Sequence, residues 1–190
     1  MADITIFKTN QSRSPENDVK MVQAAQTSLA GFKLLYLQWL TPVYRYFYYR
    51  VRNVKDAEDL TSQVFLKVYE ELPRYRDNGH FPAWLFTIVR HKATDFYRSG
   101  HSDISLETID PLDKANDLLA QTIHTDELVR LGRLIRSLPE EEKELIRLRF
   151  VVELGYKEIG ILLNRREDAV RKAISRLLDR LQSQLEVDHE

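Results

Sequence analysis

The chain has 190 residues, of which 43% are hydrophobic, so it can bury a core in one domain or in two small ones. Its formal net charge of -1 gives no overall basicity, and the absence of cysteine excludes disulfides, thiolate metal sites and redox thiols. No apolar run approaches the roughly 20 residues that cross a bilayer, and the N-terminus lacks a secretory signal, so we expect a cytoplasmic protein without membrane insertion.

The N-terminal part of the chain begins with a polar stretch and continues with helical periodicity. Residues 1–17 are polar and aperiodic, which predicts a flexible tail. Apolar residues then recur at the spacing of one helical face, namely Val22, Ala25, Leu29 and Phe32, followed by Leu35, Tyr36, Trp39 and Leu40. Pro42 suits the first turn of a helix, so we expect a further helix to begin there.

Two more helices are expected before residue 100. One covers residues 56–72 and is stopped by Pro73. The other begins at Pro82, which fits the first helical position, and runs to about Arg98. We therefore expect residues 18–98 to form an N-terminal helical bundle.

An acidic segment separates this bundle from a second helical unit. Residues 99–125 are rich in aspartate, contain Pro111 and have weak periodicity, which predicts a linker with at most one short helix. Residues 126–190 are again periodic, and Pro139 followed by three glutamates marks a break and a new helix start. No segment reads as a strand. The predicted fold class is all-α, with two small helical domains joined by an acidic linker.

The C-terminal domain contains the pattern of a helix-turn-helix, in which the second helix enters the DNA major groove. Asn164 lies where the turn between the helices needs a residue that tolerates positive φ. The expected buried stripe of the second helix is Ala169, Ala173, Ile174, Leu177 and Leu181. The side chains predicted to bind DNA are Arg165, Arg166, Arg171, Lys172, Ser175 and Arg176. A solvated amphipathic helix is the alternative interpretation of this segment alone.

Residues 81–98 interleave aromatic with basic side chains, a composition that suits single-stranded DNA, because rings stack on bases while cations hold the backbone. The preceding loop could form a pocket for an extruded base. We expect Trp84 and Ile88 to belong mainly to the core. The residues predicted to contact the melted strand are Tyr75, Asn78, His80, Arg90, His91, Lys92 and Arg98.

A third segment, residues 56–69, has an acidic polar face that would suit a basic partner helix. For residues 56–69 taken alone, a solvent-exposed face without a partner is the better interpretation, because charged helix faces are common.

The three segments together, in this order and spacing, resemble the small extracytoplasmic-function group of bacterial sigma factors. The Ala57-Glu58-Asp59-Leu60 run with Phe65 resembles the helix that docks on core RNA polymerase. Residues 81–98 resemble the helices that melt promoter DNA and read the minus-ten element. Leu138-Pro139, Leu148-Arg149-Phe150, Tyr156, Glu158-Ile159 and Val170 resemble the domain that reads the minus-thirty-five element.

The resemblance implies partners and roles. Core RNA polymerase would be bound by Asp56, Glu58, Asp59 and Gln63 at the clamp helices of its beta-prime subunit, and promoter DNA by the two basic segments. An anti-sigma factor is a further candidate partner. The linker fits either an RNA-like placeholder in the polymerase or a plain tether, and the sequence leaves both open.

This chain departs from the family pattern at several positions. Ser62-Gln63 replaces the usual Gln-Glu, and His91 stands where asparagine is common. In the helix-turn-helix, Gly160 replaces a usual alanine, which costs up to about 1 kcal/mol of helix propensity, and Asn164 replaces the turn glycine. Arg166 replaces a capping serine or threonine, a loss of about 1 kcal/mol.

Two other classes of protein are alternatives to the sigma factor. A stand-alone helix-turn-helix regulator with a helical sensing or dimerisation domain is the alternative, although the aromatic-basic run and the acidic linker argue against it. An enzyme is not expected: the five histidines are scattered, and His91 with Asp95 is a lone pair where metal sites need three or four ligands. We expect no catalytic residues, no metal and no cofactor.

Overall fold

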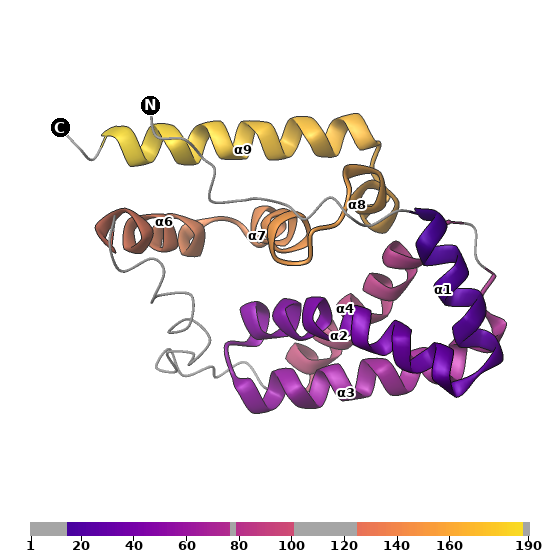
Figure 1. Cartoon of the computed structure of the whole chain (residues 1–190). Coiled ribbons are helices and arrows are strands. Elements are labelled where there is room, and N and C mark those ends of the chain that lie inside the picture. The colour runs from indigo at the N-terminus through magenta and orange to yellow at the C-terminus, as the bar shows by residue number, and fades with distance from the viewer. Residues whose placement is uncertain (1–14, 77–78, 101–124, 188–190) are drawn as a thin grey trace.

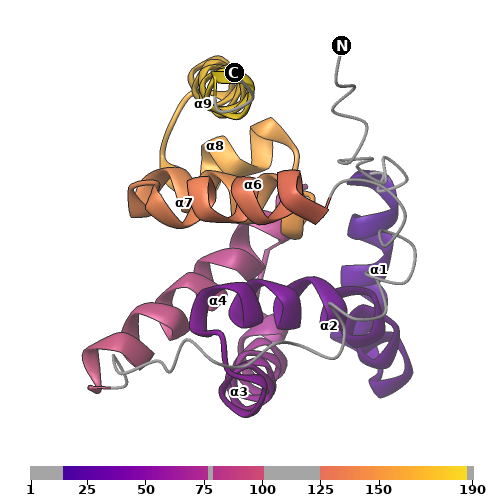
Figure 2. The ribbon, with the colours of Figure 1, turned by 90° about the vertical axis from the view of Figure 1, so that its left-hand side faces the viewer.

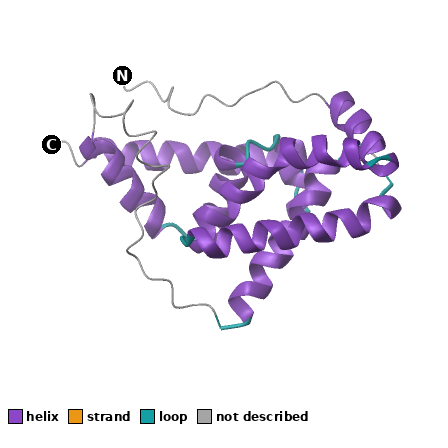
Figure 3. Ribbon diagram, turned by 60° about the horizontal axis from the view of Figure 1, so that its bottom comes forward, coloured by secondary structure: helices purple, strands orange, loops and turns teal. Residues whose placement is uncertain are grey.

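The computed structural model describes residues 15–76, 79–100 and 125–187, and every regular element within these ranges is helical (Figures 1 and 3). The predicted all-α fold is therefore confirmed. No described helix is long and apolar enough to cross a membrane. The elements are α1 (Pro15–Thr27), α2 (Leu29–Val51), α3 (Val54–Glu71), η1 (Leu72–Arg74), α4 (Phe81–Arg98), α6 (Thr125–Ser137), α7 (Glu140–Ile146), η2 (Arg147–Val151), α8 (Tyr156–Leu163) and α9 (Glu167–Val187).

The chain turns sharply between α1 and α2. Ser28 caps α2, because its hydroxyl accepts a hydrogen bond from the backbone N–H of Gly31 at 3.0 Å. A Cβ on Gly31 would lie 2.1 Å from the carbonyl oxygen of Ala24, so only glycine lets the two helices approach this closely. The expectation that Leu29 shares an apolar stripe with Ala25 is wrong, since the turn leaves Leu29 74% exposed.

The prediction that Pro42 begins a new helix is also wrong, because Pro42 lies inside α2, which is 23 residues long. A proline inside a helix costs about 3 kcal/mol. Three large side chains on one face of α2, Trp39, Tyr46 and Phe47, are fully buried. Each such burial contributes about 1.5–3 kcal/mol, which together outweighs the cost of the proline.

Helices α3 and α4 close the N-terminal bundle against α2. The side chain of Asn53 caps α3 by accepting from the N–H of Asp56 at 3.0 Å. Pro73 ends the helix in the 3-10 turn η1, and Pro82 lies in the first turn of α4, both as predicted. The centre of the bundle is aromatic: the ring of Trp39 makes T-shaped, edge-to-face contacts with Phe81 and Phe86.

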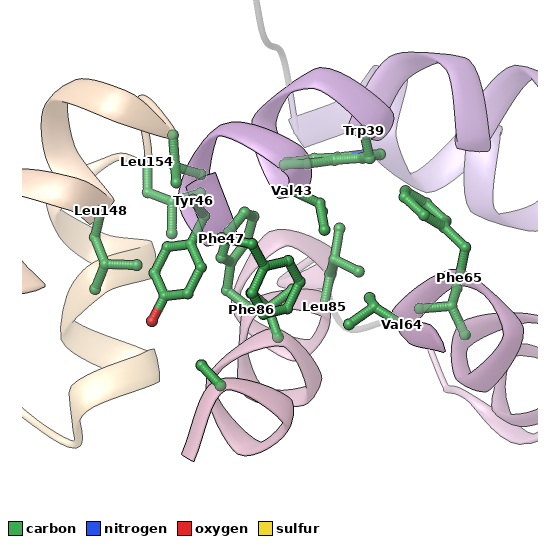
Figure 4. Close-up of a cluster of buried hydrophobic side chains, with 14 of the residues drawn as sticks. Trp39, Val43, Tyr46, Phe47, Val64, Phe65, Leu85, Phe86, Leu148 and Leu154 are labelled. Carbon is green, nitrogen blue, oxygen red and sulfur yellow. The ribbon is translucent and has the colours of Figure 1, made fainter. Parts of the chain in front are cut away.

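The C-terminal helices lie directly on this bundle. Leu148, Leu154 and Ile159 belong to the same buried cluster as Tyr46 and Phe86, so one apolar core spans both parts of the chain (Figure 4). A smaller separate cluster, Leu138, Leu177 and Leu181, joins α9 to the α6–α7 connection. Figures 1 and 2 show α9 on the outer side of α7 and α8, away from α2 and α3. The expected linker helix lies outside the described residues.

Candidate polymerase and nucleic-acid interfaces

The turn of the helix-turn-helix has the geometry that its sequence predicted. Asn164 adopts the left-handed conformation, with φ 52° and ψ 47°. The next residue, Arg165, donates its backbone N–H to the carbonyl oxygen of Gly160 at 2.7 Å. A Cβ on Gly160 would lie 2.6 Å from the carbonyl oxygen of Arg165. The absence of a side chain at Gly160 therefore permits the tight turn, a role that its helix propensity alone does not predict.

Helix α9 presents its basic face to solvent. Its buried stripe consists of Val170, Ile174, Leu177 and Leu181. The prediction that Ala169 belongs to the stripe is wrong: it is exposed, and Ala173 is half-buried. All six side chains predicted to bind DNA are exposed, namely Arg165, Arg166, Arg171, Lys172, Ser175 and Arg176.

Arg171 makes two surface contacts within the helix-turn-helix. Its guanidinium pairs with Glu167 at 2.8 Å and lies 5.0 Å from the ring centre of Tyr156. Both contacts are at the surface, where ion pairs contribute little to stability, so this arginine is available to an anionic ligand.

Helices α3 and α4 form an acidic groove of about 360 Å³. Its lining residues are Asp56, Asp59, Leu60, Gln63, Lys92, Asp95, Phe96 and Ser99. Three of the four residues predicted to bind polymerase thus share one groove, whereas the fourth, Glu58, is exposed and does not line it. Lys92, which was predicted to contact DNA, is on the groove wall, where its ammonium lies 3.5 Å from Oε1 of Gln63.

The residues predicted to contact melted DNA are spread along α4 and the loop before it. The ring centroids of Tyr75 and Trp84 lie 4.5 Å apart, and both side chains are half-buried. His80 is half-buried at the start of α4, whereas His91 and Arg98 are exposed farther along it. Asn78 lies outside the described residues.

Arg90 has a different environment from the other predicted DNA contacts, because it belongs to a cluster of charged residues between the two parts of the chain. Its Nε donates to Oε1 of Glu144 at 2.9 Å, and the hydroxyl of Tyr46 donates to the same oxygen at 2.8 Å. The other carboxylate oxygen of Glu144 accepts from Arg50 at 3.0 Å and from Arg147 at 2.9 Å. Glu140 pairs with both Arg50 and Arg147. We call these six residues the Glu144 cluster.

The cluster keeps its buried carboxylate ionised. Burial by itself would raise the pKa of Glu144, but the charges of Arg147 and Arg50 and the hydroxyl of Tyr46 outweigh it and lower the pKa below its ordinary value. The same burial, with the neighbouring negative charge of Glu144, raises the pKa of the Tyr46 hydroxyl, which stays a hydrogen-bond donor. No local pattern in the sequence predicts this cluster, because its members lie up to 98 residues apart.

The chain matches two family models. Residues 35–102 match Sigma-70 region 2, and residues 128–181 match Sigma-70, region 4. The first match covers the acidic groove and α4, and the second covers the helix-turn-helix.

Curated relatives and a solved structure are similar to the chain over most of its length. It is 34% identical to the ECF RNA polymerase sigma factor SigD of Mycobacterium tuberculosis, over 75% of this chain and 71% of SigD. It is 30% identical to the ECF RNA polymerase sigma factor BldN of Streptomyces coelicolor, over 80% of this chain but only 60% of BldN. CnrH, solved in complex with the cytosolic domain of CnrY, has the same fold, with a TM-score of 0.60 at 24% identity over 90% of this chain and 97% of CnrH.

Proposed function

Because the chain belongs to the extracytoplasmic-function group of sigma-70 RNA polymerase sigma factors, we propose that it binds core RNA polymerase and directs promoter-specific transcription initiation. The observation that carries this proposal is the presence, on one chain, of an acidic groove in the region 2 match and an exposed arginine-rich recognition helix in the region 4 match. A stand-alone DNA-binding regulator would need only the second. The action is non-catalytic and takes place in the cytoplasm, where bacterial polymerase works.

The acidic groove is the proposed polymerase site. Asp56 and Asp59 come from α3 and Asp95 from α4, so carboxylates outnumber the one lysine of the lining, and Leu60 and Phe96 add apolar surface. Such a groove suits a helix that carries basic and apolar side chains, because carboxylates attract the cations and steer the encounter. We assign the clamp helices of the beta-prime subunit to it. Glu58, exposed on the same helix, would lie at the rim of this contact.

The start of α4, the loop before it and basic side chains along α4 are the proposed site for the melted minus-ten strand. The rings of Tyr75 and Trp84, which are tilted by 32° to one another, offer an aromatic surface for an unpaired base. The basic and polar side chains assigned to this strand are Asn78, His80, Arg90, His91, Lys92 and Arg98. Of these, Arg90 and Lys92 have intramolecular partners in the structure, so they would exchange those partners for DNA.

Helix α9 is the proposed reader of the upstream promoter element. Arginine can pair with guanine through two hydrogen bonds, and lysine and serine suit phosphate contacts. The exposed row on α9 and the preceding turn supplies all three residue types. We also propose an anti-sigma factor as a partner of the chain, as the family resemblance implies.

The test of this function is co-purification of the tagged chain with bacterial core RNA polymerase at moderate salt. Asp59→Arg reverses a charge in the groove, so we expect it to abolish recovery of polymerase, because the new cation repels a basic partner. Glu70→Arg is the matched control: it makes the same charge change at an exposed position on α3 outside the groove, and should bind as the natural chain does.

Other outcomes of the co-purification would contradict the proposal. Polymerase recovered equally with Asp59→Arg and Glu70→Arg would remove the groove from the interface. No recovery with the natural chain, together with tight binding of duplex DNA by the chain alone, would favour the stand-alone regulator.

A further inference from the structure

Helix α1 lies outside the region 2 match, yet one of its side chains holds the turn that precedes α4. The match begins at residue 35, whereas α1 ends at Thr27. The side-chain nitrogen of Gln26 donates to the carbonyl oxygen of Leu72 at 2.9 Å and to that of Tyr75 at 2.7 Å. An amide nitrogen has two N–H groups, so these bonds use both of them. Gln26 thus joins α1 to the first residue of η1 and to the residue that follows η1.

These two carbonyl groups lie where the backbone changes direction. Carbonyl groups at the end of a helix lack the N–H partners of a continuing helix, so a side-chain donor can bind them. The backbone N–H of Tyr75 still bonds to the carbonyl oxygens of Glu71 and Leu72. The backbone then becomes extended at Tyr75, with φ -66° and ψ 128°. Because Gln26 binds a carbonyl group on each side of this change, it fixes the direction in which the chain leaves η1.

The position of the backbone at Tyr75 determines where its ring lies. The centroid of this ring is 4.5 Å from that of Trp84 and 5.8 Å from that of Phe81, both in α4. Phe81 is buried, whereas Tyr75 and Trp84 are half-buried and so reach the surface. A shift of the Tyr75 backbone would move its ring away from Trp84. Gln26 therefore acts on this pair of rings through the backbone of Tyr75.

Helix α1 gives the Gln26 amide a firm base. Val22 and Ala25, on the same helix, are buried in the core of the bundle. The close approach of α1 and α2 at Gly31 fixes the end of α1 next to Gln26. Because the backbone that carries this amide is already ordered, little further backbone entropy is lost when it binds the turn.

We infer that Gln26 is a positioning residue of the proposed minus-ten site, whose amide holds Tyr75 so that the rings of Tyr75 and Trp84 form one surface for an unpaired base. This inference rests on the proposed function of the two rings, and it adds α1 to the elements that build the site. Loss of the amide donors should weaken the part of single-strand binding that depends on bases, because stacking needs both rings in place. The part that depends on phosphate charge should stay unchanged.

The effect of Gln26 on the rings can be tested without DNA, by acrylamide quenching of tryptophan fluorescence in the full chain. Of the two tryptophans, Trp39 is fully buried, so changes in quenching report on Trp84. Gln26→Met removes both donors from an unbranched side chain, and Gln23→Met makes the same change at an exposed position of α1. We expect Gln26→Met to raise the quenching constant roughly 1.5-fold to twofold, because loss of two modest hydrogen bonds frees the turn in part of the molecules. Gln23→Met should leave it unchanged.

The effect on nucleic acid is tested with a fluorescent single-stranded DNA oligonucleotide and with an abasic strand of the same length. Gln26→Met should bind the oligonucleotide roughly three- to tenfold more weakly than Gln23→Met, which is about the contribution of one stacked base. Both variants should bind the abasic strand equally, because that strand offers phosphates but no rings. Circular dichroism should give the same helical signal for the two variants.

Lysine variants test whether donor groups, and not only side-chain shape, are required. Gln26→Lys restores a long side chain with several N–H donors, and Gln23→Lys adds the same charge at the control position. These two variants should bind the oligonucleotide equally.

Two results would overturn the inference. One is equal quenching and equal oligonucleotide affinity of Gln26→Met and Gln23→Met. The other is an equal loss of affinity for the abasic strand in Gln26→Met, which would indicate general damage to the fold. A natural chain that binds both strands alike would instead contradict the minus-ten assignment of the rings, and the quenching comparison would still show whether Gln26 positions Tyr75.

Discussion

Gly160 lies where the turn of the helix-turn-helix leaves no room for a side chain. By propensity alone, replacing a helical glycine by alanine stabilises a helix by about 1 kcal/mol. Here the new Cβ would lie 2.6 Å from a backbone carbonyl oxygen of the turn. We expect Gly160→Ala to lower the free energy of unfolding by about 1–3 kcal/mol, because the turn must move away.

Gly132→Ala is the matched control for this change. A Cβ on Gly132, in α6, would meet only the end of the Arg136 side chain at 3.5 Å, an ordinary contact. This variant should be neutral or stabilising in urea denaturation. If both alanine variants stabilise the chain equally, the close approach at the turn does not constrain Gly160.

The lowered pKa of Glu144 leads to a prediction about how the free energy of unfolding depends on pH. Its pKa in the folded chain is lower than the ordinary 4.5, so its ionised form stabilises the fold above that pH. This stabilisation is lost as the pH falls through the lowered pKa. The free energy of unfolding should therefore fall less steeply below pH 4.5 in Glu144→Gln than in Glu141→Gln, which makes the same change at an exposed position of the same helix. Parallel pH profiles for the two variants, measured by urea denaturation, would contradict the ionised buried carboxylate.

Among the helices, α9 leads to the clearest prediction about transcription, because its arginines are exposed. Arg171 and Arg176 are exposed on the face assigned to the upstream element. Arg171→Ala with Arg176→Ala should abolish promoter-specific initiation while sparing polymerase binding, since the acidic groove lies on other helices. The control pair Arg133→Ala with Arg136→Ala removes two exposed arginines from α6. Unchanged transcription by the α9 variant would remove these arginines from promoter recognition.

The elements also show which local signals can be read from sequence. Asn164 and Pro73 were interpreted correctly, because a positive φ and a missing N–H act within a few residues. The prediction that a helix begins at Pro42 is wrong, because the burial of Trp39 and Phe47 against distant helices decides whether α2 continues. The prediction that Leu29 lies on the apolar stripe is wrong for a similar reason, since the break at Ser28 depends on the close approach of α1 and α2.

At the scale of the whole molecule, the sequence predicted the fold class and the order of the segments that carry function. It could not predict how the two parts meet. Tyr46, Arg90 and Glu144 are brought together only by tertiary packing, and each resembles an ordinary core or surface residue in its own helix. The assignment of Arg90 to DNA stays a prediction. In the structure its Nε is paired with the carboxylate of Glu144, and DNA would compete with that ion pair.

If the chain directs core RNA polymerase to promoters, it must determine where transcripts begin, which can be measured by mapping the 5′ ends of RNA made in vitro. Core polymerase would transcribe bacterial genomic fragments with and without the purified chain. We expect discrete new start sites that require the chain, disappear with Asp59→Arg and persist with Glu70→Arg. The same set of 5′ ends with and without the chain would exclude this function.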